Sequence, residues 1–194
     1  MCSHVNTINT NTKFIILMHP KEFKKVKNGT GHLTHLSLKN SSLHVGIDFT
    51  NHKAINEVID THNCYILYPS KDAINLSNTS LPKDKNIAIF IIDSTWSCAE
   101  KIFTKSKNLQ SLDHISFDAT KLSQFMIKQQ PKDYCLSTIE STLSVLELLN
   151  KWDIENIELQ DLDIFLNPFQ KMVAFQQEII NNSSCRDVRF KKYN

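Results

Sequence analysis

The sequence predicts one α/β domain in which a mostly parallel sheet carries helices on both faces, with a C-terminal helical extension. Short apolar segments alternate with segments of helical periodicity, and this alternation is typical of parallel sheets. The apolar segments are continuously hydrophobic, as strands that are covered on both faces require. The length of 194 residues fits one domain over residues 1–194.

The first part of the chain contains most of the expected strands. Residues 13–18 (KFIILM) are apolar and β-branched, which predicts a buried strand, and a short helix carrying Leu33 and Leu36 follows an irregular basic segment. Pro69 ends a later strand, and residues 70–86 predict a loop because they are rich in Ser, Asn, Lys and Asp. The other elements expected here are strands at 43–47, 64–68, 87–92 and 113–117, and helices at 51–62 and 94–107.

Two longer helices are expected in the last third of the chain. Ser137 and Glu140 form an S-x-x-E capping box, and apolar residues at helical spacing follow it, which predicts a helix over 138–151. A final helix is predicted over 167–181. We expect residues 1–12 to be a flexible N-terminus and residues 183–194 to be a basic tail.

The composition indicates an ordinary soluble core, with 41% hydrophobic and 22% charged residues. The apolar runs are much shorter than the roughly 18 residues that span a bilayer, so no membrane association is expected. The first residues, MCSHVNTINTNTK, lack an apolar signal core, so we expect a cytoplasmic protein, and we expect a monomer. The five cysteines are far apart and never form a C-x-x-C pair, which predicts free thiols and no metal site.

The net charge of +2 is too small to predict general affinity for nucleic acid. Basic residues nevertheless cluster in two places, and such clusters suit contact with phosphates. The alternative is ordinary solvated surface or a disordered tail. The candidate RNA-binding residues are Lys21, Lys24, Lys25 and Lys27 in the first cluster, and Arg186 and Arg189 in the second.

Polar residues follow three of the predicted strands, and ligands of open parallel sheets bind beyond the carboxyl ends of the strands. The three sites are His19-Pro20-Lys21-Glu22, Tyr68-Pro69-Ser70 and Asp93-Ser94-Thr95-Trp96, with Ser137-Thr138 as a fourth candidate. The Gly-rich nucleotide-binding motifs are absent, so a ligand must be held in another way. The residues alone leave open whether Asp93 is only the N-cap of a helix that starts at Ser94, whether Trp96 only packs, and whether Ser137 and Thr138 only cap.

The ordered set of motifs resembles the DTW-domain family, whose members resemble tRNA-uridine aminocarboxypropyltransferases. The motifs are HPKE at 19–22, N-G-T at 28–30, YP at 68–69, DSTW at 93–96 and LSTIE at 136–140, over roughly residues 13–150. The resemblance implies a SPOUT-related fold with a C-terminal trefoil knot. Ser94 stands where the family usually has Gly. Many relatives carry an N-terminal cysteine cluster of which only Cys2 remains, because it was lost or because it lies upstream of Met1.

The resemblance also implies a reaction. The enzyme would transfer the 3-amino-3-carboxypropyl group of S-adenosylmethionine to N3 of a tRNA uridine, with the variable loop as the expected target, and release methylthioadenosine. Asp93 is the expected general base, and Thr95 and Trp96 complete the catalytic set. Trp96 would stack on the uracil or line the channel of the transferred group. The residues expected to bind S-adenosylmethionine are Tyr68, Pro69, Ser94, Leu136, Ser137 and Thr138.

Two other functions stay open at this point. The first is a SPOUT-class RNA methyltransferase that uses the same co-substrate. The second is a non-catalytic RNA-binding module. His19 and Glu22 are equally compatible with closing the site and with structural hydrogen bonding.

Overall fold

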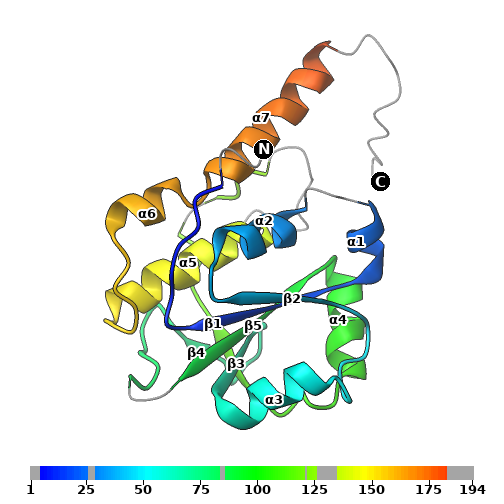
Figure 1. The fold of residues 1–194 in the computed structure, drawn as a ribbon, viewed down its shortest axis with the longest axis vertical. Coiled ribbons are helices and arrows are strands. Elements are labelled where there is room, and N and C mark those ends of the chain that lie inside the picture. Colours follow the sequence, from blue (N-terminus) through cyan, green and yellow to red (C-terminus); the bar gives the residue numbers. More distant parts are fainter. Residues whose placement is uncertain (1–4, 26–28, 84–85, 121, 126–134, 183–194) are drawn as a thin grey trace.

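The computed structural model describes residues 5–25, 29–83, 86–120, 122–125 and 135–182 (Figure 1). Its centre is a six-stranded sheet in the order β2-β1-β5-β3-β6-β4, and all five pairings are parallel, which confirms the predicted sheet type. The carboxyl ends of all strands therefore lie at one edge. The strands are β1 (Lys13–Met18), β2 (Ser41–Val45), β3 (Asn63–Leu67), β4 (Ile74–Asn75), β5 (Ile87–Asp93) and β6 (Asp113–Ser116).

Helices cover both faces of the sheet, as the sequence predicted (Figure 1). Helices α2, α5, α6 and α7 bury their apolar side chains against one face, and α3 and α4 bury theirs against the other. The helices are α1 (Pro20–Lys25), α2 (Thr30–Ser37), α3 (Lys53–Thr61), α4 (Trp96–Lys105), α5 (Thr138–Lys151), α6 (Leu159–Ile164) and α7 (Asn167–Asn182).

The central strand β5 shows why the strand segments are continuously apolar. Ile89 and Ile91 belong to the core on the α2 and α5 face, whereas Ala88 and Phe90 belong to the core on the α3 and α4 face. Successive side chains of a strand point to opposite faces, so a strand covered on both sides needs apolar residues at every position. Each large side chain buried in this way contributes about 1.5–3 kcal/mol.

Most predicted elements are confirmed to within about two residues, and three short elements were missed. Helix α1 lies in a segment expected to be irregular, β4 lies in the expected loop over 70–86, and α6 was not predicted. Strand β4 has only two residues and exists because it pairs with β6, so no local pattern in the sequence marks it. Strand β2 begins two residues earlier than expected, because Ser41 and Ser42 already pair with β1.

The N-terminal segment expected to be flexible is held in place from Ile8 onward. Ile8 is buried and forms a parallel bridge with Leu38. The buried carboxylate of Glu155 accepts the backbone N–H groups of Asn11 (3.0 Å) and Thr12 (2.6 Å). This segment therefore enters β1 along a fixed path. Residues 1–4 and the predicted basic tail at 183–194 lie outside the described residues.

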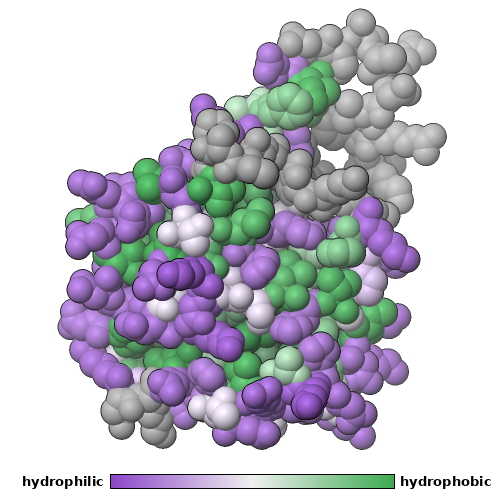
Figure 2. All heavy atoms as spheres, in the orientation of Figure 1, coloured by the Kyte–Doolittle hydropathy of each residue, from purple (hydrophilic) through white to green (hydrophobic). Residues whose placement is uncertain are grey.

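The predicted C-terminal helical extension is confirmed as α6 and α7. The first half of α7 buries Phe169, Met172 and Val173 in the core. Its second half projects from the body of the molecule and exposes Phe175 and Ile179 (Figures 1 and 2). Within the part of the chain that the structure describes, no helix has the length and apolar character needed to cross a membrane.

A buried carboxylate fixes the start of α5. Glu140 accepts hydrogen bonds from the N–H (2.8 Å) and the hydroxyl (2.5 Å) of Ser137, from the hydroxyl of Ser123 (2.8 Å) and from the N–H of Gln124 (2.6 Å). The predicted capping box is thus confirmed, and it is larger than the motif alone indicates. Because Ser123 and Gln124 follow β6, Glu140 ties that segment to the N-terminus of α5.

We expect Glu140→Ala to lower the free energy of unfolding by roughly 2–3 kcal/mol, because the substitution leaves several buried donors without an acceptor. Urea denaturation measures the change. The matched control is Glu57→Ala on the exposed surface of α3, which removes the same charge and should change stability by less than about 0.5 kcal/mol. Equal losses in the two variants would contradict a structural role for the Glu140 hydrogen bonds.

Candidate active site

The candidate site lies at the carboxyl edge of the sheet, where β1 and β5 end side by side. Met18 pairs with Asp93 in the β1–β5 register, and the N–H of His19 donates to the carbonyl of Asp93 at 3.4 Å. Tyr68 follows β3, the strand on the other side of β5. The sheet therefore brings the three polar strand ends of the sequence to a common edge.

The Asp93 carboxylate is buried and connects β5 to two helices. Its Oδ1 accepts the hydroxyls of Thr138 at 2.5 Å and of Thr30 at 3.4 Å. Thr138 is the first residue of α5 and Thr30 is the first residue of α2. The carboxylate therefore lies at two helix N-termini, whose positive dipole ends favour its negative charge.

The helix expected to start at Ser94, with Asp93 as its N-cap, starts later. Helix α4 begins at Trp96 with Thr95 in the N-cap position. Asp93 is still paired in β5, so its backbone continues the strand and cannot begin the helix. The alternative that Asp93 is only the N-cap of α4 is therefore excluded, and its carboxylate joins α2 and α5 instead.

Gly31 lies directly against the Asp93 carboxylate. A Cβ atom at this position would lie 2.5 Å from both Cγ and Oδ2 of Asp93, so a larger residue would have to displace the carboxylate. Sequence reasoning missed this residue. The available signal was its rarity, because the chain has only three glycines and Gly31 directly follows the N-G-T motif.

The remaining residues of the DSTW motif differ in exposure. The Ser94 hydroxyl is buried and has no hydrogen-bond partner among the described residues, and the same holds for Nδ1 of His32, the residue after Gly31. A buried polar atom without a partner costs about 1–3 kcal/mol, so water or a polar ligand is the expected partner of both atoms. Thr95 is exposed, and 51% of Trp96 is exposed.

His19 is a structural hydrogen-bond acceptor in this site. Its ring is buried, and its Nδ1 accepts the N–H of Lys21 at 3.1 Å in the first turn of α1. Burial lowers the pKa of His19, and the positive charges of Lys21 and Lys101 lower it further against the opposing effect of Glu22. The ring is therefore held neutral, with its proton on Nε2.

The predicted co-substrate residues lie at this edge but do not share one face of the sheet. The ring of Tyr68 stacks on Phe103 (4.6 Å between centroids) and meets His114 edge-on, in the core beneath α3 and α4. Asp93 hydrogen-bonds to residues on the opposite face. Pro69 is exposed, and Leu136 is half-buried directly before Ser137.

Of the predicted RNA-binding residues, Lys21 and Lys24 are exposed on α1. The side chain of Lys25 lies outside the described residues, as do Lys27, Arg186 and Arg189. In the described ranges, no group of three or more His, Cys, Asp or Glu residues is placed to hold a metal ion.

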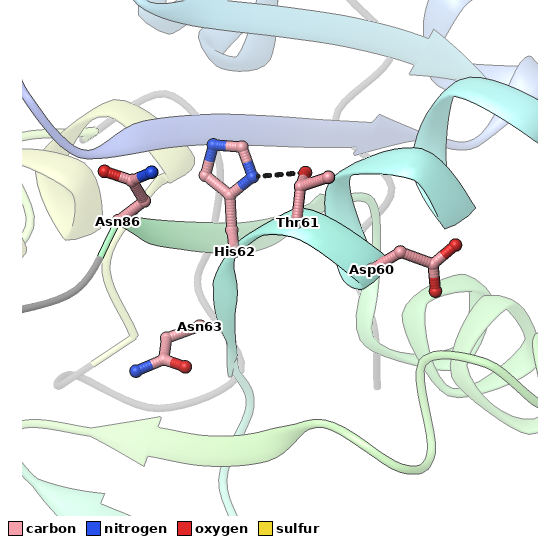
Figure 3. A pocket seen from close by; sticks show the side chains of 5 residues that line it. All are labelled: Asp60, Thr61, His62, Asn63 and Asn86. Carbon is pink, nitrogen blue, oxygen red and sulfur yellow. Dashed lines mark hydrogen bonds between the residues drawn. The ribbon is translucent and has the colours of Figure 1, made fainter.

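A polar pocket occurs at the opposite edge of the sheet (Figure 3). It is lined by residues around the starts of β3 and β5: Asp60, Thr61, His62, Asn63 and Asn86. Figure 3 shows His62 bonded to the Thr61 hydroxyl, at 2.8 Å. None of the residues predicted for the site lines this pocket.

Comparison with known proteins gives three curated relatives, each described as "tRNA-uridine aminocarboxypropyltransferase 2". The Macaca fascicularis protein is 30% identical over 173 residues, covering 87% of this chain and 56% of the relative. The Drosophila melanogaster protein is 29% identical over 143 residues (71% and 56%), and the Mus musculus protein is 28% identical over 176 residues (89% and 57%). The chain thus spans little more than half the length of these relatives. No solved structure matches it significantly.

The DTW domain family matches residues 1–177, which include the whole sheet and the Asp93 site. The match extends well beyond the residues 13–150 over which the motifs occur. The chain therefore belongs to the DTW domain family.

Proposed function

We propose that this chain transfers the 3-amino-3-carboxypropyl group of S-adenosylmethionine to N3 of a tRNA uridine and releases methylthioadenosine. The observation that carries the proposal is the buried Asp93 carboxylate, held between the N-termini of α2 and α5 at the carboxyl edge of the sheet. The names of the curated relatives support the same reaction. A uridine of the variable loop is our proposed target.

The role of Asp93 in the proposed reaction is to accept the N3 proton of uridine, because protonated N3 is a poor nucleophile. N3 then forms a bond with the carbon of the aminocarboxypropyl group that is attached to sulfur. The bond between that carbon and sulfur breaks, its electron pair stays on sulfur, and methylthioadenosine leaves. The methyl group carries the same leaving group, so the orientation of the co-substrate decides which group is transferred.

The polar groups around Asp93 suit the charged end of S-adenosylmethionine. The N-termini of α4 and α5 offer N–H groups to its carboxylate, and the buried Ser94 hydroxyl lies directly after Asp93. Ser137 and Thr138 would contribute through the start of α5. We assign the adenine to the segment Tyr68-Pro69 and to Leu136. Because the Tyr68 ring packs in the core, its proposed contribution is its backbone.

The fold that accompanies this proposal is SPOUT-related, with a C-terminal trefoil knot. The parallel sheet, with β5 between β1 and β3, fits an α/β fold of this kind. The position of α5 supports it as well. This helix follows β6 near one side of the sheet, yet its first residue bonds to Asp93 at the end of β5.

We expect Asp93→Asn to bind tRNA and S-adenosylmethionine normally and to form product at least 100-fold more slowly, since general bases contribute about 10²–10⁴ in rate. The assay is nucleoside mass spectrometry of tRNA incubated with the full chain and S-adenosylmethionine. Wild-type protein should add the mass of one aminocarboxypropyl group to uridine. A methyl mass indicates a methyltransferase instead, and a wild-type rate for Asp93→Asn would show that Asp93 is not the base.

We expect Thr138→Val to slow product formation by roughly 10- to 100-fold, because it removes the shorter of the two hydroxyl contacts that orient the Asp93 carboxylate. Thr138→Ser keeps the hydroxyl and is the matched control, with a rate close to that of the wild type. If Val and Ser behave alike, the hydroxyl does not position Asp93.

We expect Gly31→Ala to lower product formation by roughly 10- to 100-fold and to reduce thermal stability by less than this loss of activity would require, although the added Cβ also lies 2.9 Å from the Cβ of the buried Asp93. The added methyl displaces the Asp93 carboxylate, whereas the helix propensity of Ala, about 1 kcal/mol better than that of Gly, offsets part of the strain. Parallel measurements of product formation and thermal unfolding separate the two effects. Loss of stability in proportion to activity would show that Gly31 is needed only for packing.

A further inference from the structure

We propose that the exposed rings of Phe23 and Trp96 form a stacking surface for the unpaired bases of single-stranded RNA next to Asp93. Exposed lysines of α1 and α4 would contact the flanking phosphates. The inference rests on the proposed function, since it assigns the surface that presents the tRNA loop to the site. We call this set the aromatic-lysine surface; it consists of Lys21, Phe23, Lys24, His32, Trp96 and Lys101.

Phe23 is the first observation behind this proposal. Its ring stacks on His32 at 5.5 Å between centroids and an interplanar angle of 28°, while 47% of the residue stays exposed. The stack holds the ring in a defined orientation and leaves much of its apolar surface in water. A ring presented in this way can take a planar partner on its open side, as aromatic residues of single-strand-binding proteins do.

The position of this stack links it to the candidate site. His32 directly follows Gly31, whose backbone contacts the Asp93 carboxyl group. Phe23 lies on α1, which begins directly after His19, the residue that donates its N–H to the Asp93 carbonyl. The two rings of the stack therefore belong to two segments, the starts of α1 and α2, that each adjoin a residue in contact with Asp93.

Trp96 provides a second exposed ring close to the same carboxylate. It begins α4, three residues after Asp93, and 51% of it is exposed. This exposure is notable because Trp has a large hydrophobic ring that usually buries much of its surface. Strands β1 and β5 end side by side at Met18 and Asp93, so the helices that follow them, α1 and α4, leave the same part of the edge (Figure 1). The two rings are thus presented from neighbouring helices.

The charges around these rings suit an RNA backbone. Lys21, Lys24 and Lys101 are exposed, and Lys21 and Lys101 are close enough to His19 to lower its pKa. Glu22 and Glu100 are the acidic residues on the same two helices, so the lysines outnumber them. Aromatic rings with interspersed lysines match the alternating bases and phosphates of a single strand better than they match an apolar protein partner.

The test uses the full chain with Trp152→Phe, which leaves Trp96 as its sole tryptophan. The probe is a short oligouridylate, and the control probe is an abasic oligonucleotide of equal length. Stacking predicts that the oligouridylate quenches Trp96 fluorescence and that the abasic probe does not. Because Trp152 donates to the Leu76 carbonyl, circular dichroism must first show that the variant is folded. If it is not, anisotropy of labelled oligouridylate with Trp96→Leu replaces the quenching assay.

Phe23→Leu should weaken binding of the oligouridylate by roughly 5- to 100-fold, and Phe23→Tyr should restore it, since base stacking contributes about 1–3 kcal/mol per base. The matched control is Phe175→Leu, which changes a similarly exposed phenylalanine on the projecting part of α7 (56% against 47% for Phe23) and should leave affinity unchanged. Equal affinity for the two probes, or no effect of Phe23→Leu, overturns the proposal. The proposal also fails if Phe23→Leu and Trp96→Leu convert a dimer into monomers and leave the affinity for the oligouridylate unchanged.

The outcomes also separate this inference from the proposed function. If wild-type protein modifies tRNA and Phe23→Leu keeps both its affinity for tRNA and its rate, the stacking surface is refuted and the enzyme assignment holds. If wild-type protein leaves tRNA unmodified but its Trp96 is quenched only by the oligonucleotide that contains bases, the stacking surface holds and the proposed reaction fails.

Discussion

The arrangement of the site depends on one buried charge, the carboxylate of Asp93. A carboxylate at 7% exposure needs hydrogen-bond donors, because burying an unpaired charge is costly. Its donors include Thr138 and Thr30, each the first residue of a helix. Satisfying the charge therefore brings the N-termini of α5 and α2 to the end of β5, where Gly31 permits the close approach. The contacts that complete the fold here are the same contacts that would orient Asp93 in its proposed role as a base.

The two faces of the sheet contribute differently to this arrangement. On one face, Asp93 reaches α2 and α5, and Glu140 and Glu155 bind backbone N–H groups of the adjoining segments. On the other face, Tyr68, Phe103 and His114 pack as a compact aromatic group beneath α4. The first face therefore combines an apolar core with buried carboxylates at its margins, and the second face ends in packed aromatic rings. The family motifs that follow β3 and β5 accordingly contain residues of both kinds.

Much of the fold follows from local patterns, whereas the site does not. Continuous apolar segments predict the central strands, and the S-x-x-E box predicts the start of α5. Both predictions succeed because strand burial and helix capping require particular residue types at neighbouring positions. Strand β4 and the start of α4 were not predictable, since the pairing of β4 with β6 and the continuation of β5 through Asp93 are set by neighbouring strands. The partners of Asp93 lie 45 and 63 residues away along the chain, and no spacing rule identifies them.

The bond between Glu155 and the segment before β1 has a consequence for how the chain folds. It joins Thr12 to a carboxylate 143 residues later, so it closes a loop that contains most of the molecule. Contacts at such separations carry a large loop-closure entropy and form late. During synthesis, β1 therefore leaves the ribosome long before Glu155, the residue that binds the segment in front of this strand. We expect the N-terminal segment to be among the last parts to reach its final position, after the parallel sheet has assembled.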